Sequence, residues 1–215
     1  MKAYFLSGLG ADYRAFQMLK LPSNIEVVHL AWLTPLKHES LHSYAKRMAE
    51  KINTDEPYYL VGLSFGGMLA TEMLTFLKPQ KTIFISSVLL RKELPFYFKF
   101  WFTSIGVQLM PRALITKPNW LIHFIFGVTS SQEKHLLDTI VKEANPEFVF
   151  WAMQQVLNFE QNKLPNAPYI RIHGTLDKIL PIHHFIPTYT IANGSHFMVA
   201  NKAKEISAIL AKEMK

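Results

Sequence analysis

Cysteine is absent from this 215-residue chain, and its absence removes several kinds of chemistry. A chain without thiols has no disulfide framework, no thiolate nucleophile and no cysteine-ligated zinc site. Acidic residues are also few, 16 against 23 lysines and arginines, which gives a net charge of +7. Because the basic residues are scattered rather than clustered, we expect a solvated basic surface and no nucleic-acid partner.

Long apolar runs are missing as well. In segment 94–127, which is dense in aromatic residues, the longest uncharged stretches fall well short of the roughly 20 apolar residues that span a bilayer. The apolar run after Lys2 is broken at Ser7 and Gly8, which indicates a strand rather than a secretory signal. We therefore expect a cytoplasmic location. Because 49% of the residues are hydrophobic, we also expect one domain with a substantial core.

Glycine is sparse, with nine in the chain, but two of the nine flank a serine. The sequence Gly62-Leu63-Ser64-Phe65-Gly66 joins an apolar, β-rich run to a helical pattern. A nucleophile on so tight a turn needs glycine on either side, because a Cβ there would clash with the neighbouring strand and helix. The G-x-S-x-G pattern in this context is typical of a nucleophile elbow, so Ser64 is the candidate nucleophile.

A serine hydroxyl needs a base and an orienting acid before it can attack an ester. Asp177 lies in a turn just after the strand-like run Tyr169–Ile172, and His196 lies in a glycine-containing loop before the last helical pattern. The order Ser64, Asp177, His196 is that of the α/β-hydrolases and differs from the orders of chymotrypsin and subtilisin. On these residues the chain resembles the α/β-hydrolase family.

Each of the three residues also has a plainer interpretation. Ser64 would fit a tight turn in a protein without catalysis, since a fold does not determine a function. Asp177 would fit a helix cap, and His196 a structural loop histidine. Some members of the family place the acid after the preceding strand, but the sequence Ser-Ser-Val at 86–88 offers no carboxylate there.

Apolar, β-rich runs alternate with helical patterns along the chain. This alternation predicts an α/β fold with a mostly parallel sheet flanked by helices. The resemblance implies a sheet of about six strands, two fewer than is common in the family. All three candidate residues follow strands, at the carboxyl ends where sites form in such sheets. The expected strands are Ala3–Leu6, Ile25–Leu30, Tyr58–Val61, Thr82–Ile85, Tyr169–Ile172 and Thr188–Ile191, with a helix over Leu41–Ile52 capped by Ser40.

The segment between the fourth and fifth expected strands is too long for a simple crossover. Its aromatic first half is interrupted by prolines, and two helical patterns follow. Ser130 with Glu133 indicates a capping box for one helix, and Asn145-Pro146 opens the other. The resemblance implies a helical lid over residues 89–164, inserted into a hydrolase core formed by residues 1–88 and 165–215.

The aromatic side chains of this segment either pack the lid onto the core or line an acyl pocket. We take Phe98 and Trp101 as candidates for substrate binding. The resemblance further implies an oxyanion hole formed by the backbone N–H groups of Leu9 and Phe65. Ser7 stands where the family usually has the histidine of a His-Gly pair, but backbone donors do not depend on that side chain.

Three other patterns suggest different chemistry. Residues 38–42 match the zinc-binding pattern H-E-x-x-H. If Ser40 caps the following helix, however, His38 lies outside that helix, and no third ligand follows in the sequence. We therefore expect no metal site. Gly8-Leu9-Gly10 begins a dinucleotide motif that Tyr13 does not complete. His183 and His184 are rival bases, but they lie before the last expected strand.

Together these residues predict a serine hydrolase that cleaves carboxylic esters of apolar small molecules through an acyl-enzyme, without cofactor. A thioesterase or another acyl hydrolase would use the same residues. From a different class, a non-catalytic protein could keep the pocket as a receptor for a small ligand. Peripheral contact with a membrane through the aromatic lid is a further hypothesis. The substrate's acyl chain and the oligomeric state are left open.

Overall fold

The computed structural model describes residues 1–101 and 117–215, and for residues 99–101 the backbone alone. A six-stranded sheet runs through the described chain in the order β2-β1-β3-β4-β5-β6, with every neighbouring pair parallel. The predicted parallel sheet of six strands is confirmed, and each strand ends within two residues of its expected bounds. The strands are β1 (Lys2–Leu6), β2 (Glu26–His29), β3 (Tyr58–Leu63), β4 (Lys81–Ile85), β5 (Tyr169–Gly174) and β6 (Tyr189–Ile191).

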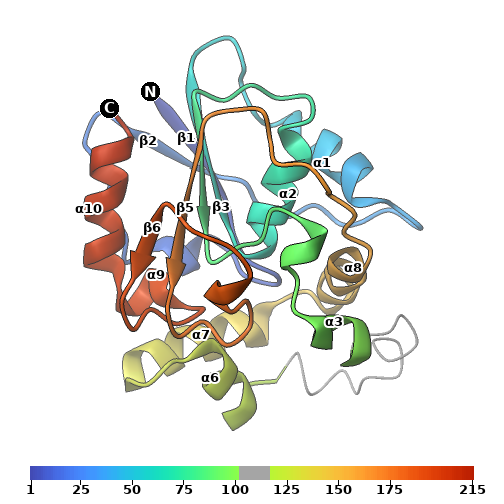
Figure 1. The fold of residues 1–215 in the computed structure, drawn as a ribbon, viewed down its shortest axis with the longest axis vertical. Coiled ribbons are helices and arrows are strands. Elements are labelled where there is room, and N and C mark those ends of the chain that lie inside the picture. The colour runs from blue at the N-terminus through green and yellow to red at the C-terminus, as the bar shows by residue number, and fades with distance from the viewer. Residues whose placement is uncertain (102–116) are drawn as a thin grey trace.

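Helices cover both faces of the sheet (Figure 1). Alternate residues of the central strand β3 point to opposite faces, as the period of a strand requires. Tyr58 and Leu60 pack with helices α1 (Leu41–Ala49), α2 (Phe65–Met73) and α8 (Pro146–Leu157). Tyr59 and Val61 pack on the other face, with the C-terminal helices α9 (Met198–Asn201) and α10 (Ala203–Glu213) and with the 3-10 turn η1 (Tyr13–Phe16). Burial on both faces explains why β3 is continuously apolar.

Helix α1 begins where the sequence predicts and ends three residues early. The hydroxyl of Ser40 accepts a hydrogen bond from the backbone N–H of Ser43, at 3.1 Å, and so caps the first turn. After Ala49 the chain tightens, because the N–H of Ile52 bonds to the carbonyl of Ala49 rather than to the residue four positions back. Ile52 is still buried in the core.

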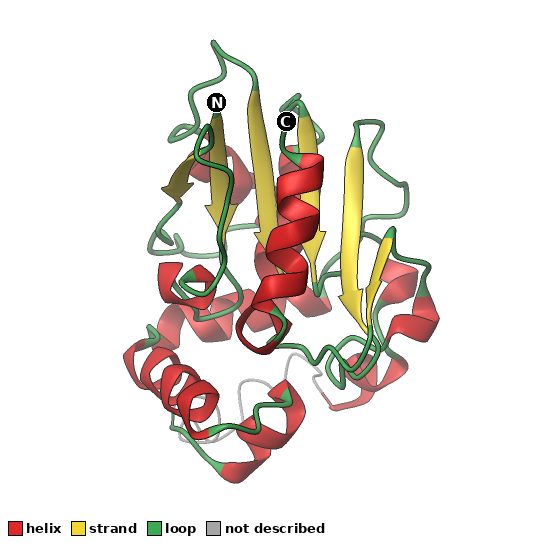
Figure 2. Cartoon of the chain, turned by 90° about the vertical axis from the view of Figure 1, so that its left-hand side faces the viewer, coloured by secondary structure: helices red, strands yellow, loops and turns green. Residues whose placement is uncertain are grey.

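The helices between β4 and β5 lie at the end of the sheet toward which the strands point (Figure 2). In the described part of this segment they are η2 (Arg91–Glu93), α3 (Phe96–Trp101), α6 (Trp120–Phe126), α7 (Ser131–Glu143) and α8, and a short turn η3 (Ile182–His184) follows β5. Asn145 caps α8 and Pro146 is its first residue, as predicted. The lid boundaries at 89 and 164 stay a prediction.

The cap of helix α7 differs in one detail from the predicted capping box. Ser130 accepts from the N–H of Glu133 at 3.2 Å, as expected. The carboxylate of Glu133, however, accepts from the N–H of Thr129, one residue before the cap, at 3.0 Å. The bond from Glu133 to Ser130 satisfies one free N–H of the first turn, whereas the carboxylate of Glu133 bonds outside the helix and not to the N–H of Ser130 as a capping box requires.

A buried ion pair joins the start of the inserted segment to the sheet. Arg171 on β5 makes two hydrogen bonds of 2.8 Å to the two carboxylate oxygens of Glu93 in η2. The side chains are only 7% and 4% exposed. Glu93 also accepts from the backbone N–H of Leu89 at 2.8 Å, and the guanidinium carbon of Arg171 lies 3.8 Å from the ring centroid of Phe185.

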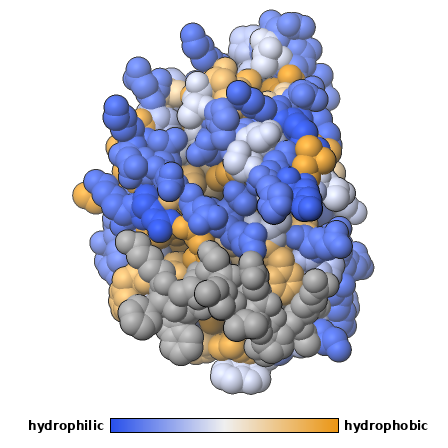
Figure 3. Space-filling model, turned by 90° about the vertical axis from the view of Figure 1, so that its right-hand side faces the viewer, coloured by the Kyte–Doolittle hydropathy of each residue, from blue (hydrophilic) through white to orange (hydrophobic). Residues whose placement is uncertain are grey.

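The molecular surface is largely hydrophilic on the face drawn in Figure 3. Apolar side chains gather there toward the lower end, where the inserted helices lie. No helix in residues 1–101 or 117–215 combines the length and the apolar character needed to cross a bilayer.

The Arg171–Glu93 pair gives a stability prediction. Glu93→Gln leaves the buried guanidinium without a counter-charge, so we expect the free energy of unfolding to fall by about 3–5 kcal/mol. The matched control is Glu205→Gln, since Glu205 pairs with Lys202 at the surface, where the loss should stay below about 1 kcal/mol. Urea unfolding at pH 7 measures both, and equal small losses would contradict the assigned importance of the buried pair.

Candidate active site

Ser64 sits on a tight, unusual turn between β3 and α2. Its backbone has φ 52° and ψ −117°, in the region that non-glycine residues rarely adopt. The neighbouring glycines are required by space: a Cβ on Gly62 would lie 2.5 Å from the Cα of Gly67, and one on Gly66 would lie 2.3 Å from the carbonyl oxygen of Ser7. The structure therefore has the close approach that the G-x-S-x-G pattern predicts.

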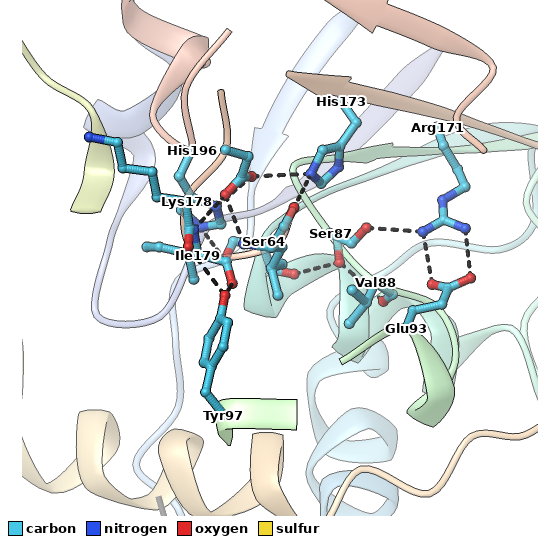
Figure 4. Close-up of polar contacts among 12 residues, drawn as sticks. Ser64, Ser87, Val88, Glu93, Tyr97, Arg171, His173, Lys178, Ile179 and His196 are labelled. Carbon is cyan, nitrogen blue, oxygen red and sulfur yellow. Dashed lines mark hydrogen bonds and ion pairs between the residues drawn. The ribbon is translucent and has the colours of Figure 1, made fainter. Parts of the chain in front are cut away.

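Three side chains from three different loops meet at this turn (Figure 4). Ser64 Oγ lies 2.9 Å from His196 Nε2, and His196 Nδ1 lies 2.8 Å from Asp177 Oδ2. Because a carboxylate only accepts, Nδ1 carries the hydrogen, and in the neutral imidazole Nε2 is then free to accept from the serine hydroxyl. The structure thus brings together the three residues that the sequence singles out, and their catalytic roles stay a prediction.

The Asp177 carboxylate is fully buried and fully hydrogen-bonded. Its Oδ1 accepts from the backbone N–H groups of Ile179, at 2.9 Å, and Leu180, at 2.8 Å. Its Oδ2 accepts from His196 and also lies 3.2 Å from His173 Nε2. Burial acting alone would raise the pKa of Asp177, but the two histidines outweigh it and hold that pKa well below its usual range. Asp177 is therefore ionised at neutral pH.

The loop after β1 lies against Ser64. A Cβ on Gly8 would be 3.6 Å from the Cβ of Ser64, and Leu9 and Phe65 line the same cavity as the serine. Among the described residues, the backbone N–H of Leu9 has no acceptor, and Phe65 opens helix α2, where the first N–H groups have no intrahelical partner. Both donors are thus available, and their role in an oxyanion hole stays a prediction.

Ser7 holds this loop closed. Its hydroxyl donates to the carbonyl oxygen of Ala11 at 2.6 Å, and the indole N–H of Trp32 donates to the same oxygen at 2.8 Å. Gly10 has φ 69°, the left-handed conformation that the turn requires. At the position where α/β-hydrolases usually have histidine, the hydroxyl of Ser7 therefore stabilises the loop by a hydrogen bond to its backbone.

A cavity of about 480 Å³ opens beside Ser64 and His196. Its walls are almost entirely apolar and come from helices α6, α7 and α8, from α3 and from the Asp177 loop. Phe98, one of the two candidate substrate contacts, lines this cavity, and its role in substrate binding stays a prediction. The side chain of Trp101, the other candidate, lies outside the described residues.

Part of the inserted segment presents aromatic side chains to solvent. Trp120 and Phe96 are each 76% exposed and Phe124 is 57% exposed. The ammonium of Lys178 lies 3.4 Å from the ring centroid of Phe124. Contact with a membrane surface through this region stays a prediction.

The residues of the H-E-x-x-H pattern have separate surroundings. His38 lies outside α1, in a turn with φ 58°, as the Ser40 cap implied. Glu39 is buried and forms an ion pair of 2.8 Å with Arg47, while His42 lies 3.4 Å from Glu72. In the described ranges no three His, Asp or Glu side chains gather so as to hold a metal ion.

A second histidine at the site, besides His196, was not predicted from the sequence. His183 and His184, the rival bases, lie in η3 with their rings 4.2 Å apart. The imidazole that touches Asp177 besides His196 is His173, at the end of β5 and 1% exposed. In the sequence, the only indication of this contact was that His173 lies four residues before Asp177. The folded loop is needed to show that His173 Nε2 lies near Asp177 Oδ2.

Comparison with known proteins gives the fold. No family model matches the sequence, and no curated protein matches it either. Among solved structures, a thermophilic esterase from Thermogutta terrifontis matches with a TM-score of 0.77 and 13% identity over 100% of this chain and 89% of its own. A bromoperoxidase from Bacillus anthracis has a TM-score of 0.71 and 17% identity over 97% and 90% of the two chains. A thioesterase from the prodiginine pathway of Streptomyces coelicolor has a TM-score of 0.68 and 13% identity over 99% and 90%.

This chain has the α/β-hydrolase fold. The predicted fold class is confirmed, and the three candidate residues all follow the carboxyl ends of strands, namely β3, β5 and β6. The three solved neighbours differ in the activity that their names give, so the choice among activities depends on the site itself.

The tight turn at Ser64 gives a prediction about its glycines. Gly66→Ala places a Cβ 2.3 Å from one backbone oxygen and 2.4 Å from another, so the strand and helix must separate. We expect a loss of at least about 1–3 kcal/mol in the free energy of unfolding. Gly8→Ala is the matched control, because its added Cβ meets only ordinary contacts. Thermal and urea unfolding measure both, and a Gly66→Ala protein as stable as the control would show that the turn is looser than described.

Proposed function

We propose that this α/β-hydrolase is a serine hydrolase that cleaves carboxylic esters of apolar small molecules. The observation that carries the proposal is the continuous chain of hydrogen bonds from Ser64 Oγ through His196 to Asp177, at 2.9 and 2.8 Å, beside an apolar cavity. A buried carboxylate, an imidazole in the matching tautomer and a hydroxyl on an elbow are the parts that acyl transfer requires.

In the proposed reaction Ser64 Oγ attacks the acyl carbon while His196 Nε2 takes the hydroxyl proton. The carbonyl oxygen gains the negative charge and accepts hydrogen bonds from the backbone N–H groups of Leu9 and Phe65. When the intermediate collapses, His196 returns the proton to the leaving alcohol, and Ser64 keeps the acyl group. Ionised Asp177 stabilises the imidazolium that forms between the two proton transfers.

Water then attacks the acyl-enzyme by the same route in reverse. His196 takes a proton from the water, the oxyanion forms again, and the proton passes to Ser64 Oγ as the carboxylic acid leaves. Every bond change is served by groups of this chain and by water, so the proposed reaction requires no metal or organic cofactor.

The apolar cavity supports an apolar substrate. Its walls offer few hydrogen-bonding side chains besides Ser64 and His196, so a charged or compact polar acyl group would lose hydration without replacement. The same site would accept a thioester, and a thioesterase is among the solved neighbours. A receptor that binds a small ligand without turnover is the alternative from a different class, and the closed set of hydrogen bonds at Ser64 favours catalysis over it.

The nucleophile is tested by Ser64→Ala. Loss of the hydroxyl should lower ester turnover by on the order of 10⁶ and abolish labelling by a fluorophosphonate, since nothing else accepts the acyl group. Ser43→Ala is the matched control, because Ser43 is an exposed serine on α1 that does not line the cavity beside Ser64. Hydrolysis of an activated short ester measures turnover, and near wild-type activity in Ser64→Ala would exclude the proposed reaction.

The apolar cavity is tested with a homologous ester series. Each buried methylene is worth about 0.8 kcal/mol, so kcat/KM should rise close to fourfold per carbon and fall once the cavity is full. Phe98→Ala should flatten the rise, because this ring lines the cavity, whereas Trp120→Ala should not, because that ring is exposed and is not part of the cavity lining. A wild-type profile that is flat or falls from acetate onward would contradict an apolar acyl site.

A further inference from the structure

His173 is a buried histidine to which the proposed reaction assigns no step. It lies near the end of β5, is 1% exposed and packs edge-on against Phe185, with ring centroids 4.7 Å apart. Its Nε2 lies 2.7 Å from the carbonyl oxygen of Leu180 and 3.2 Å from Asp177 Oδ2. A carbonyl oxygen only accepts, so Nε2 carries a hydrogen, which bonds to Leu180 and lies close to the Asp177 carboxylate.

Two imidazoles therefore share one carboxylate oxygen (Figure 4). His196 Nδ1 donates to Asp177 Oδ2 at 2.8 Å, on the side toward Ser64, and His173 Nε2 approaches the same oxygen at 3.2 Å. The other carboxylate oxygen, Oδ1, is taken by two backbone N–H groups of the same loop. The carboxylate consequently has donors on both oxygens and little freedom to rotate.

We infer that His173 is a positioning residue, which fixes the Asp177 carboxylate and limits how strongly that carboxylate stabilises the protonated form of His196. The inference rests on the proposed function. The N–H group of His173, 3.2 Å from Oδ2, partly offsets the negative potential of the oxygen that faces His196. Asp177 then stabilises the imidazolium of His196 less than a carboxylate without this neighbour would.

The sign of this effect does not depend on whether His173 is charged. A neutral His173 holds the positive end of its N–H dipole 3.2 Å from Oδ2, and a protonated one adds a positive charge near His196, so both oppose protonation of His196. Three other charged or titratable groups near the loop bond elsewhere. Tyr97 donates to the carbonyl oxygen of Ile179 at 2.8 Å, Arg171 pairs with Glu93, and Lys178 donates to the carbonyl oxygen of Phe124 at 3.1 Å.

A purely structural role makes a different prediction. If His173 only tied the loop through Leu180, its loss would lower stability without moving the pH dependence of catalysis. The test compares His173→Phe, which keeps the ring against Phe185 but has no N–H, with His173→Gln, whose amide can donate to Oδ2 again. His183→Phe is the matched control, the same change at an exposed histidine on η3.

For His173→Phe we expect the midpoint of the acid limb of the kcat/KM profile to move to higher pH by about 0.5 to 1 unit. We also expect kcat on the alkaline plateau to fall several-fold with KM nearly unchanged. His173→Gln should recover most of both quantities, and His183→Phe should match the wild type. A folded His173→Phe protein with the wild-type midpoint and kcat would overturn the inference.

A second readout separates this inference from the proposed function. The His196 Nδ1–H that bonds to Asp177 should give a downfield proton NMR resonance, assigned by its loss in His196→Ala, and no substrate is needed to follow it. Its titration midpoint should rise in His173→Phe even if the protein hydrolyses no ester. His173→Met, which fills the space flexibly without an N–H, replaces the Phe variant if that variant does not fold. An unchanged midpoint in a folded variant would overturn the inference, whereas absent Ser64-dependent turnover would overturn only the proposed function.

Discussion

The close approach of backbone to backbone at the Ser64 turn is the constraint on which the rest of the site depends. A strained residue of this kind costs about 1–3 kcal/mol and persists only where its surroundings enforce it. Here the N–H of Ser64 donates to the carbonyl oxygen of Ile85 at 2.9 Å, and its carbonyl oxygen accepts from Ser87 Oγ at 2.7 Å. Arg171, paired with Glu93, donates in turn to the carbonyl oxygen of Ser87 at 3.3 Å. The Ser64 turn is thus tied to the end of β4 and, through Ser87, to a buried ion pair that includes Arg171 of β5.

The parallel sheet explains how residues far apart in sequence reach the elbow. In a parallel sheet all strands end at one edge, so the loops after β3, β5 and β6 open on the same side. Ser64, Asp177 and His196 each come from one of these loops, and the inserted helices close over the same edge. The shared edge at which the parallel strands end therefore accounts both for the chain of hydrogen bonds and for the apolar cavity beside it.

Features governed by local chemistry could be read from the sequence. The tight turn at Ser64 could be predicted because only glycine fits at its flanking positions, and the strands could be predicted from apolar runs. The helix starts could be predicted from side chains such as Ser40 and Asn145, which accept hydrogen bonds from free backbone N–H groups. Features that depend on how distant loops meet could not. The burial of His173 suits a strand in a covered sheet, but its contact with Asp177 arises from the path of the following turn. The aromatic inserted segment likewise gave no sign of which rings face the cavity, as Phe98 does, and which face solvent, as Trp120 does.

The central claim, that the hydrogen-bonded chain makes Ser64 an acyl acceptor, is tested most directly by trapping the acyl-enzyme. The protein is mixed with an excess of an activated apolar ester, quenched in acid within the first turnovers and analysed by intact-protein and peptide mass spectrometry. The account predicts a mass gain equal to one acyl group, located on Ser64 and lost as the acylated protein turns over in water. Absence of the adduct while ester is being consumed, or its location on another residue, would contradict it.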